Sequence, residues 1–293
     1  MFDWLGEGIA NFFLGIAQSL FDLFAAMMEN VASNSTVSGA FDSLFGGAEV
    51  WNMVTTVHQT LIIPIAESIL ALLMLVQLVK ISQRIDATAT LPAVKDIVFL
   101  AVFYVLFHWL IVNSLDIVTA IYDIFNGITT SILPSSEGYT AAFDLSSVEP
   151  SWDTIGGCAL LALFGLVSVF IGAIAYIVAL VVSMARALQL YVMAAFSPLP
   201  LSLLGFEESR QMGIGFLKNF CAVALAGTIM MFTMYAYPFL LASVSGVDSG
   251  GLAAVANGEN SGIFSLLSVL AISIMYIFAL AKSGAWSREI LGG

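Results

Sequence analysis

Tracts of apolar residues, each close to the length of a membrane-spanning helix, alternate along the chain with short polar segments. An α-helix needs about 20 consecutive apolar residues to cross the hydrocarbon core of a bilayer. Five tracts approach this length, and they cover residues 61–79, 97–112, 155–185, 220–244 and 263–281. The pattern predicts an all-α polytopic membrane protein with about five transmembrane helices, the second of which continues as a helix toward Leu133.

A sixth apolar stretch, residues 187–204, contains the sequence Ser-Pro-Leu-Pro near its centre. Pro198 and Pro200 have no backbone N–H, and the ring of each clashes with the preceding helical turn. A regular helix is therefore expected to break at this point. Two interpretations stay open: a re-entrant hairpin that enters and leaves on one side of the membrane, or a full span with a proline kink, which gives six spans.

The basic residues are few, and their positions predict how the chain is oriented in the membrane. Short loops that carry Lys or Arg stay in the cytoplasm, and the eight basic residues are Lys80, Arg84, Lys95, Arg186, Arg210, Lys218, Lys282 and Arg288. The first 79 residues carry no basic residue, and neither does the acidic loop of residues 134–154. We therefore expect the N-terminus outside the cell membrane and the C-terminus in the cytoplasm.

This orientation favours the re-entrant hairpin, at about residues 187–209. Arg186 and Arg210 flank the segment and form its base on the cytoplasmic side, while Ser197, Pro198 and Pro200 form its tip. Non-helical backbone survives at membrane depth only where protein or water satisfies its polar groups. The tip is therefore expected to face protein or a water-filled cavity rather than lipid.

Residues 1–48 are predicted to form an extracytoplasmic amphipathic helix and a linker, ahead of a transmembrane helical domain of residues 49–293. Polar residues recur at spacings of four and seven, which places them on one helical stripe; they are Asp3, Glu7, Asn11, Gln18, Asp22 and Glu29. Interfacial helices usually carry Lys or Arg on this face. Because this face is acidic, docking against neighbouring subunits is at least as good an interpretation as lying on lipid.

A stripe of small residues follows one face of the long third tract. Its members step by three and four and include Gly165, Ser168, Gly172, Ala175 and Ala179. Small residues at this spacing let two helix backbones approach closely. The pattern predicts a helix-packing surface, with packing inside the chain favoured over a contact between subunits.

Glu67 is the one carboxylate deep in a predicted span, and His108 is its predicted partner. Glu67 lies thirteen residues before Lys80, and His108 lies thirteen residues after Lys95. The two helices form a hairpin around one cytoplasmic loop, so both side chains are expected at the same depth, about 20 Å from the loop. An ionisable residue in a membrane span indicates either a functional site or a structural hydrogen bond, and both interpretations stay open.

Composition excludes most soluble and enzymatic classes. The chain of 293 residues is 60% hydrophobic and 10% charged, with a net charge of −12. A general nucleic-acid-binding surface would be basic, and the sequence has no phosphate-binding loop, no paired-histidine zinc motif and no Cys-x-x-Cys. We therefore expect no catalytic residues, no cofactor and no metal site.

The segment VVSMARALQLYVMAAFSPLPLSLLGFEESRQMGIGFLKNF and the opening MFDWLGEGIANFFLGIAQSLFDLF carry a resemblance to a known family. Together with the predicted spans, they resemble the TrbL/VirB-type polytopic channel subunit of conjugative type IV secretion systems, in the branch found on integrative elements of Gram-positive bacteria. The resemblance covers nearly the whole chain.

This resemblance implies a cell-membrane channel or assembly subunit, forming a homo-oligomer, that helps to move relaxase-bound single-stranded DNA. The implied partners are the lipid bilayer, a secretion ATPase, a coupling ATPase and single-span scaffold subunits. A secondary transporter or small-ion channel with Glu67 in its pathway is the alternative, because transporters also use discontinuous helices at their binding sites.

Overall fold

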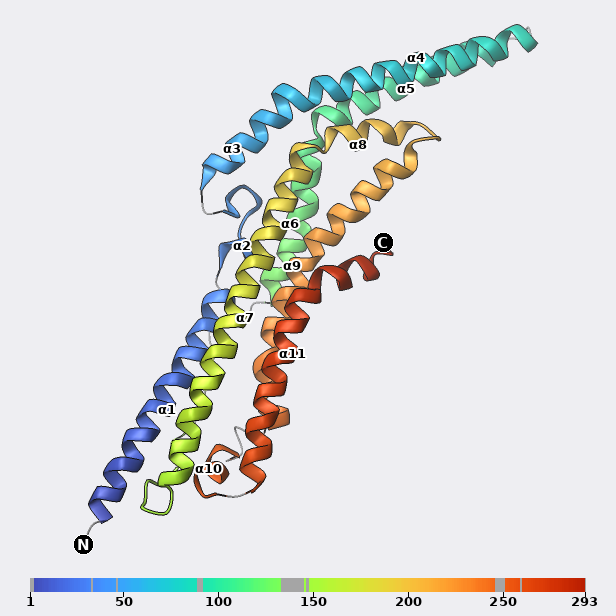
Figure 1. The fold of residues 1–293 in the computed structure, drawn as a ribbon. Coiled ribbons are helices and arrows are strands. Elements are labelled where there is room, and N and C mark those ends of the chain that lie inside the picture. The colour runs from blue at the N-terminus through green and yellow to red at the C-terminus, as the bar shows by residue number, and fades with distance from the viewer. Residues whose placement is uncertain are drawn as a thin grey trace. The chain divides into compact units, whose positions relative to one another are not determined.

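The computed structural model describes residues 3–32, 34–45, 47–88, 92–132, 145, 148–245, 251–258 and 260–292. These residues form helices and connecting turns, with no β-strand among them (Figure 1). The helices are α1 (Asp3–Ala32), α2 (Ser35–Ser38), η1 (Phe41–Ser43), α3 (Ala48–Val57), the π-helical turn η2 (His58–Ile62), α4 (Ile63–Thr88), α5 (Pro92–Val112), α6 (Ser114–Ile132), α7 (Ile155–Ala195), α8 (Pro198–Ser202), η3 (Leu203–Gly205), α9 (Arg210–Ser245), α10 (Gly251–Ala256) and α11 (Asn260–Ile290). The all-α prediction is confirmed.

Six helical segments in the described part of the chain are long and apolar enough to cross a membrane. Four of them contain predicted tracts in full, and the segment Arg210–Leu241 covers most of the fifth tract, 220–244. The prediction of a polytopic membrane protein is therefore confirmed, and the sixth segment lies in α1. Helix α1 is apolar enough to be a candidate span because its apolar residues are not limited to the face that packs on the protein. Trp4, Phe12 and Leu23, for example, are exposed.

Several helix boundaries differ from those predicted. Helix α7 continues to Ala195, ten residues beyond the predicted end of its tract at 185, and α9 begins at Arg210 rather than 220. The predicted continuation of the second span is present as α6, which follows α5 after an interruption at Asn113. Charged residues set the expected ends of the spans, but they do not end a helix that packs on its neighbours.

The chain divides into two compact units. The first unit comprises Met1–Ser38, Ile128–Met184 and Gly227–Ser283, and the second comprises Gly39–Gly127, Ala185–Ala226 and Gly284–Gly293. Each unit has its own buried cluster of apolar side chains. The division does not follow the order of the sequence, because long helices such as α7 and α9 contribute to both units.

In the first unit, α1 packs along the first part of α7 (Figure 1). The five small residues predicted as a packing stripe are all buried on α7. A Cβ atom added to Gly172 would lie 2.4 Å from the ring of Phe24, and one added to Gly165 would lie 3.1 Å from Leu20. The stripe therefore lets α1 approach α7 closely within one chain.

The predicted polar stripe of α1 lies away from this contact. Glu7, Asn11, Asp22 and Glu29 are exposed, and the half-buried Gln18 donates a hydrogen bond to Asp22 at 2.9 Å. The side chain of Asp3 lies outside the described residues. Helix α1 is thus polar on one outward stripe, while its small and aromatic residues on another face form the contact with α7.

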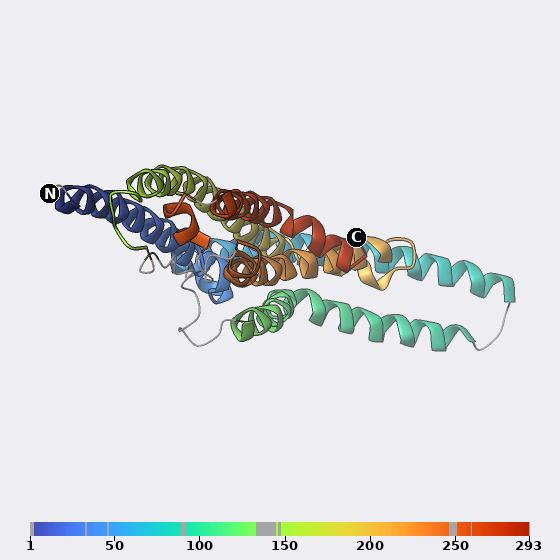
Figure 2. The same cartoon turned by 90° about the horizontal axis from the view of Figure 1, so that it is seen from below.

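The second unit is built around an aromatic cluster. The ring of Phe41 lies within 6.4 Å, centroid to centroid, of Trp51, Tyr122, Tyr191 and Phe220, which come from α3, α6, α7 and α9. In the same unit, α4 and α5 form a long antiparallel hairpin, which Figure 2 shows from below. Short helix α8 packs against both helices of this hairpin.

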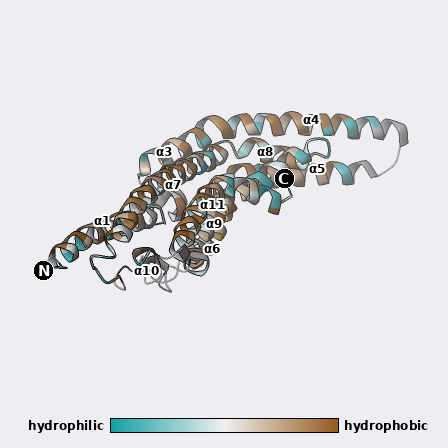
Figure 3. Cartoon of the chain, turned by 60° about the horizontal axis from the view of Figure 1, so that its bottom comes forward, coloured by the Kyte–Doolittle hydropathy of each residue, from teal (hydrophilic) through white to brown (hydrophobic). Residues whose placement is uncertain are grey.

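The outward faces of the long helices are apolar, as expected for surfaces in contact with lipid or other subunits. Most residues of α7, and of α11 before its C-terminal end, are hydrophobic (Figure 3). Phe170 and Leu163 on α7, and Phe264 and Phe278 on α11, are all exposed. A soluble protein rarely exposes so much contiguous apolar surface.

The close contact of α1 with α7 predicts that a large residue at Gly172 destabilises the first unit. We expect Gly172→Leu to lower the free energy of unfolding by on the order of 2 kcal/mol, because an overpacked contact forces side chains and backbone apart. The measurement is equilibrium unfolding of the purified chain in mixed detergent micelles.

Gly15→Leu is the matched control for this substitution. Gly15 is also a helical glycine of the first unit, but an added Cβ would meet nothing within 4 Å. This variant should unfold as the parent protein does, or slightly later because leucine favours helix more than glycine does. Equal stability of the two variants would contradict the packing described for Gly172.

Candidate functional site

The predicted break at Ser-Pro-Leu-Pro is where α7 ends. Ala194 would normally accept a hydrogen bond from the N–H of residue 198, but Pro198 has none. The buried Ser197 hydroxyl replaces this donor, with its Oγ 2.8 Å from the Ala194 carbonyl oxygen. Pro198 then starts α8, a position that proline tolerates because the first helical N–H has no partner in the helix.

The stretch of residues 187–204 is therefore not a single element. Its first part belongs to α7, and the rest forms α8 and η3, after which a turn leads to α9 at Arg210. Gly205 allows this connection to lie on α5, because a Cβ there would be 2.5 Å from the Phe107 ring. Of the two predicted flanking residues, Arg210 is exposed, whereas Arg186 is buried inside α7.

Arg186 joins several elements of the second unit. Its Nε donates to the Val223 carbonyl oxygen at 3.0 Å and its Nη2 to the Ala224 carbonyl oxygen at 3.2 Å, both on α9. The guanidinium carbon lies 6.0 Å from the ring centroid of Tyr122 on α6. The Tyr122 hydroxyl donates in turn to the Gly39 carbonyl oxygen at 2.8 Å. Sequence reasoning placed Arg186 at the base of a hairpin, and it did not find this buried network.

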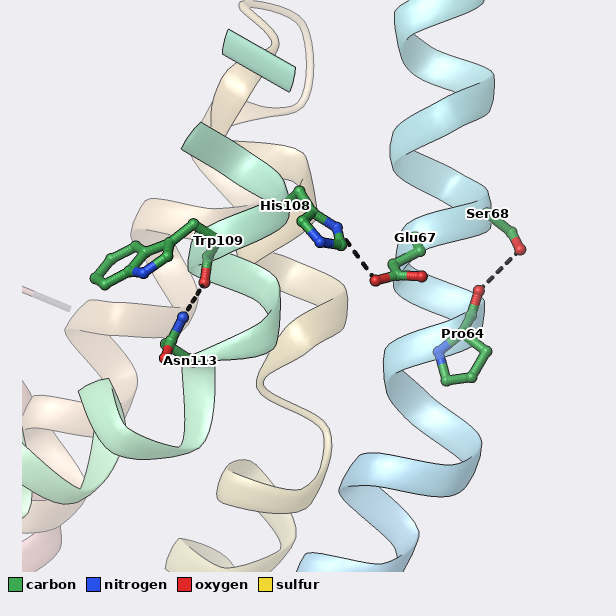
Figure 4. Close-up of polar contacts among 6 residues, drawn as sticks. All are labelled: Pro64, Glu67, Ser68, His108, Trp109 and Asn113. Atoms are coloured by element: carbon green, nitrogen blue, oxygen red, sulfur yellow. Dashed lines mark hydrogen bonds and ion pairs between the residues drawn. The ribbon is translucent and has the colours of Figure 1, made fainter. Parts of the chain in front are cut away.

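Glu67 and His108 lie against each other across the α4–α5 hairpin (Figure 4). The distance from His108 Nδ1 to Glu67 Oε1 is 3.2 Å, and the side chains are 48% and 39% exposed, respectively. Both residues belong to segments that are long and apolar enough to span a membrane. The nearby Ser68 and Asn113 side chains donate to the backbone carbonyl oxygens of Pro64 and Trp109, four residues earlier in the chain, and not to the pair. The pair is thus a polar site on the outer surface of an apolar hairpin.

A second histidine contact lies deeper in the same unit. The buried His58 has its Nε2 2.8 Å from the Ser114 hydroxyl at the start of α6, and its Nδ1 has no hydrogen bond within the described part of the chain. His58 opens the π-helical turn η2 (His58–Ile62), just before Pro64. Such turns often mark functional positions in helices. The only sequence signal for this turn was Pro64 inside an apolar tract.

The end of α4 is tied to the turn before α9. Lys80 Nζ donates to Glu208 Oε1 at 2.6 Å, and this hydrogen bond lowers the pKa of the exposed Glu208 carboxyl. The small stability that the pair adds is present at neutral pH and is lost as the pH falls through the lowered pKa. Exposed pairs of this kind contribute little, but the contact shows that both segments meet on one side of the second unit.

Metal ligation has no support in the part of the chain that the structure describes. No three residues among its His, Cys, Asp and Glu side chains come together in a way that could hold a metal ion. The polar contacts described above include two histidine contacts and one arginine network, and each of these joins separate helices. These contacts can position helices, exchange protons or face a polar path.

The contact between Glu67 and His108 predicts that the two residues are energetically coupled. Glu67→Ala and His108→Ala should each lower the free energy of unfolding, and the double variant should lose less than the sum. Hydrogen-bonded pairs in membrane helices give coupling energies of about 0.6 kcal/mol on average and at most about 1.7 kcal/mol. The measurement is a double-mutant cycle of equilibrium unfolding in mixed micelles.

Ser68→Ala combined with His108→Ala is the control cycle. Ser68 is next to Glu67, but its hydroxyl donates to Pro64 of its own helix at 2.8 Å. Residues without a shared contact show additive effects, so this cycle should give no coupling. Additive losses in the Glu67–His108 cycle as well would show that the two side chains do not interact.

A family model covers the part of the chain that contains most of these contacts. The family model described as TrbL/VirB6 plasmid conjugal transfer like protein matches residues 27–198, more than half of the 293 residues. Comparisons with curated proteins and with solved structures found no match. The matched stretch contains the Glu67–His108 pair, Arg186 and the start of the proline-containing break. On this match, the chain belongs to the TrbL/VirB6 family of plasmid conjugal transfer-like proteins.

Proposed function

We propose that the chain is a channel or assembly subunit of a conjugative type IV secretion system and helps relaxase-bound single-stranded DNA to cross the cell membrane. Its family membership makes it a membrane subunit of a conjugal transfer system. The observation that carries the finer proposal is the half-exposed Glu67–His108 pair on the apolar α4–α5 hairpin.

The surroundings of this pair favour a subunit that works in an assembly. Leu72, Leu75, Val102 and Val105 on the same two helices are exposed, so the hairpin surface is largely apolar. Ionisable groups in membrane spans almost always face the interior of a bundle or a water-filled cavity. Within the part of the chain that the structure describes, both side chains stay about half exposed, whereas neighbouring copies around a conduit would enclose them. A homo-oligomer therefore accounts for the pair better than a monomer does.

Energy and cargo would come from partner proteins. The sequence has no phosphate-binding loop, so in this proposal a secretion ATPase and a coupling ATPase drive transfer, and single-span scaffold subunits hold the assembly. The turn of residues 203–209 carries Glu207 and Glu208 and is the part of the proposed hairpin, about residues 187–209, that offers exposed charge to such partners.

We also propose an N-terminus outside the cell and a cytoplasmic C-terminus, with five crossings. The contact of Lys80 with Glu208 supports a common side for the first basic loop and the turn before α9. Helix α7 has 41 residues, so it is about 60 Å long, twice the thickness of the hydrocarbon core. In this arrangement the start of α1 lies on the outer side of the membrane, beside Trp152, which a Cβ at Gly6 would touch.

A secondary transporter or small-ion channel with Glu67 in its pathway is the second candidate. The observation that favours it is the same carboxylate–imidazole contact, because such pairs also relay protons in transporters. The two candidates differ in their partners: a transporter acts alone, whereas a conduit subunit requires the ATPases of its system.

The proposed role predicts that conjugal transfer depends on the Glu67–His108 pair. We expect Glu67→Ala and His108→Ala to reduce the transfer frequency at least about tenfold in a mating assay, at equal amounts of protein in the membrane, because an unpaired polar group disturbs the assembly. Ser68→Ala is the control and should transfer at the parental frequency. The subunit should also copurify with the secretion ATPase.

Two results would contradict the proposed function. Unchanged transfer in cells that lack the protein would exclude a role in conjugation. Ion flux through vesicles that contain only the purified chain, abolished by Glu67→Gln, would instead support the transporter.

The proposed topology predicts which positions react from outside the cell. In a background of Cys158→Ser and Cys221→Ser, single cysteines at Gly8, Glu149 and Gly258 should react with an impermeant thiol reagent, whereas a cysteine at Glu289 should react only after lysis. All four positions are exposed. Reaction at Gly8 only after lysis would show that α1 is a sixth span, and reaction at Glu289 in intact cells would contradict the cytoplasmic C-terminus.

A further inference from the structure

A hollow of about 450 Å³ lies within the second unit, between the start of α9 and the end of α11. Its α9 wall follows a single helical face, since Gln211, Gly215, Lys218 and Ala222 step by three and four along the helix. Arg288 and Leu291 line the facing wall. The volume falls in the usual range of small-ligand sites, about 300–1,000 Å³.

The charge of the hollow is positive. Lys218 and Arg288 both line it, and no lining residue is acidic. Neither cation forms a salt bridge with any described residue, although the chain as a whole carries a net charge of −12. The amides of Gln211 and Asn219 add further hydrogen-bond donors. Two cations without a salt bridge to the described residues, and two amides around the same hollow, are a set of donors suited to a phosphate group.

The floor of the hollow leaves room for a ligand. A Cβ atom added to Gly215 would meet nothing within 4 Å, so the backbone is open at this point on the lining face. Lys218 stands one turn further along the same helix. A phosphate between them could contact the lysine while staying clear of bulky side chains.

The position of the hollow indicates where the phosphate comes from. One candidate span begins at Arg210 and another ends at Ile290, so the hollow lies at the ends of two helices long and apolar enough to cross a membrane, and we place it near the bilayer interface. Met212 and Ile290 are next in the chain to the lining residues Gln211 and Leu291, and each is 66% exposed, as expected of side chains beside acyl chains. Basic pockets between membrane helices at this level bind the headgroups of anionic lipids.

We propose that this hollow binds the phosphate group of an anionic phospholipid headgroup. Single-stranded nucleic acid, whose phosphates share this chemistry, fits less well, because such strands bind through aromatic side chains on which the bases stack. None of the lining residues is aromatic. The proposal does not rest on a conduit role, since a lipid bound here would hold the ends of α9 and α11 at the membrane surface in any of the functions considered.

The test uses the full-length chain in a neutral detergent, with lipid binding counted by native mass spectrometry. The probes are phosphatidylglycerol, phosphatidylcholine, inorganic phosphate and a short oligothymidylate. We expect phosphatidylglycerol to bind more tightly than phosphatidylcholine, and inorganic phosphate to compete only weakly. Lys218→Gln and Arg288→Gln should each weaken the binding of phosphatidylglycerol about fivefold, the effect of one basic residue near an anionic membrane surface.

Two further variants separate the site from general charge. Gly215→Leu fills the hollow without changing charge and should also weaken phosphatidylglycerol binding. Lys95→Gln removes an exposed positive charge on α5, outside the hollow, and should leave binding unchanged. Because Lys218 and Arg288 are exposed, all variants should unfold at the parental temperature without lipid, which excludes a folding defect.

Four results would overturn the proposal. These are equal binding of the two lipids, binding that the three hollow variants leave unchanged, inorganic phosphate binding as tightly as phosphatidylglycerol, and oligothymidylate binding more tightly than phosphatidylglycerol. The third result would assign the hollow to free phosphate, and the fourth to nucleic acid.

Discussion

The buried guanidinium of Arg186 is the constraint on which the second unit depends. An ionised group taken out of water is very costly unless its donors are satisfied, and here the acceptors are two successive carbonyls of α9, with the Tyr122 ring beside them. Helices α6, α7 and α9 therefore have to meet at one level. The same requirement brings Tyr122 to Gly39, next to Phe41, around which the aromatic cluster of the unit forms.

At the proline-containing break, as at Arg186, a buried polar group has to be hydrogen-bonded, but here the group is a backbone carbonyl. A chain in an apolar environment cannot leave backbone carbonyls without donors, and Pro198 removes the donor that Ala194 would have used. The adjacent Ser197 supplies a hydroxyl in its place. Because the Ser197 hydroxyl takes the place of the missing N–H, α7 can end inside the protein, and α8 can pack on the α4–α5 hairpin before α9 starts. Sequence and tertiary packing thus agree on where the longest helix stops.

Local sequence patterns predicted the apolar helices, the break after Ala195 and the small-residue face of α7, because each is set by residues near one another in the chain. The meeting of Glu67 with His108 followed from equal distances to one loop. The role of Arg186 could not be predicted in this way. Its partners lie on α6 and α9, far away in the sequence. The positive-inside rule assigns each arginine to a cytoplasmic loop, so it does not predict that backbone carbonyls of another helix accept hydrogen bonds from a buried arginine. The π-helical turn at His58 was missed because periodicity analysis assumes a regular helix.

Arg186 and the Glu67–His108 pair show two different solutions for polar groups in an apolar protein. Arg186 is enclosed by its own chain, so its network is complete in one copy. Among the described residues, Glu67 and His108 have each other as polar side-chain partners, and they remain about half exposed among apolar side chains. A group of this kind is stable in a membrane when another surface or water covers it. The polar groups of Arg186 therefore have their partners within one chain, whereas Glu67 and His108 need another surface or water to cover them. This need is expected of a subunit rather than of a protein that acts alone.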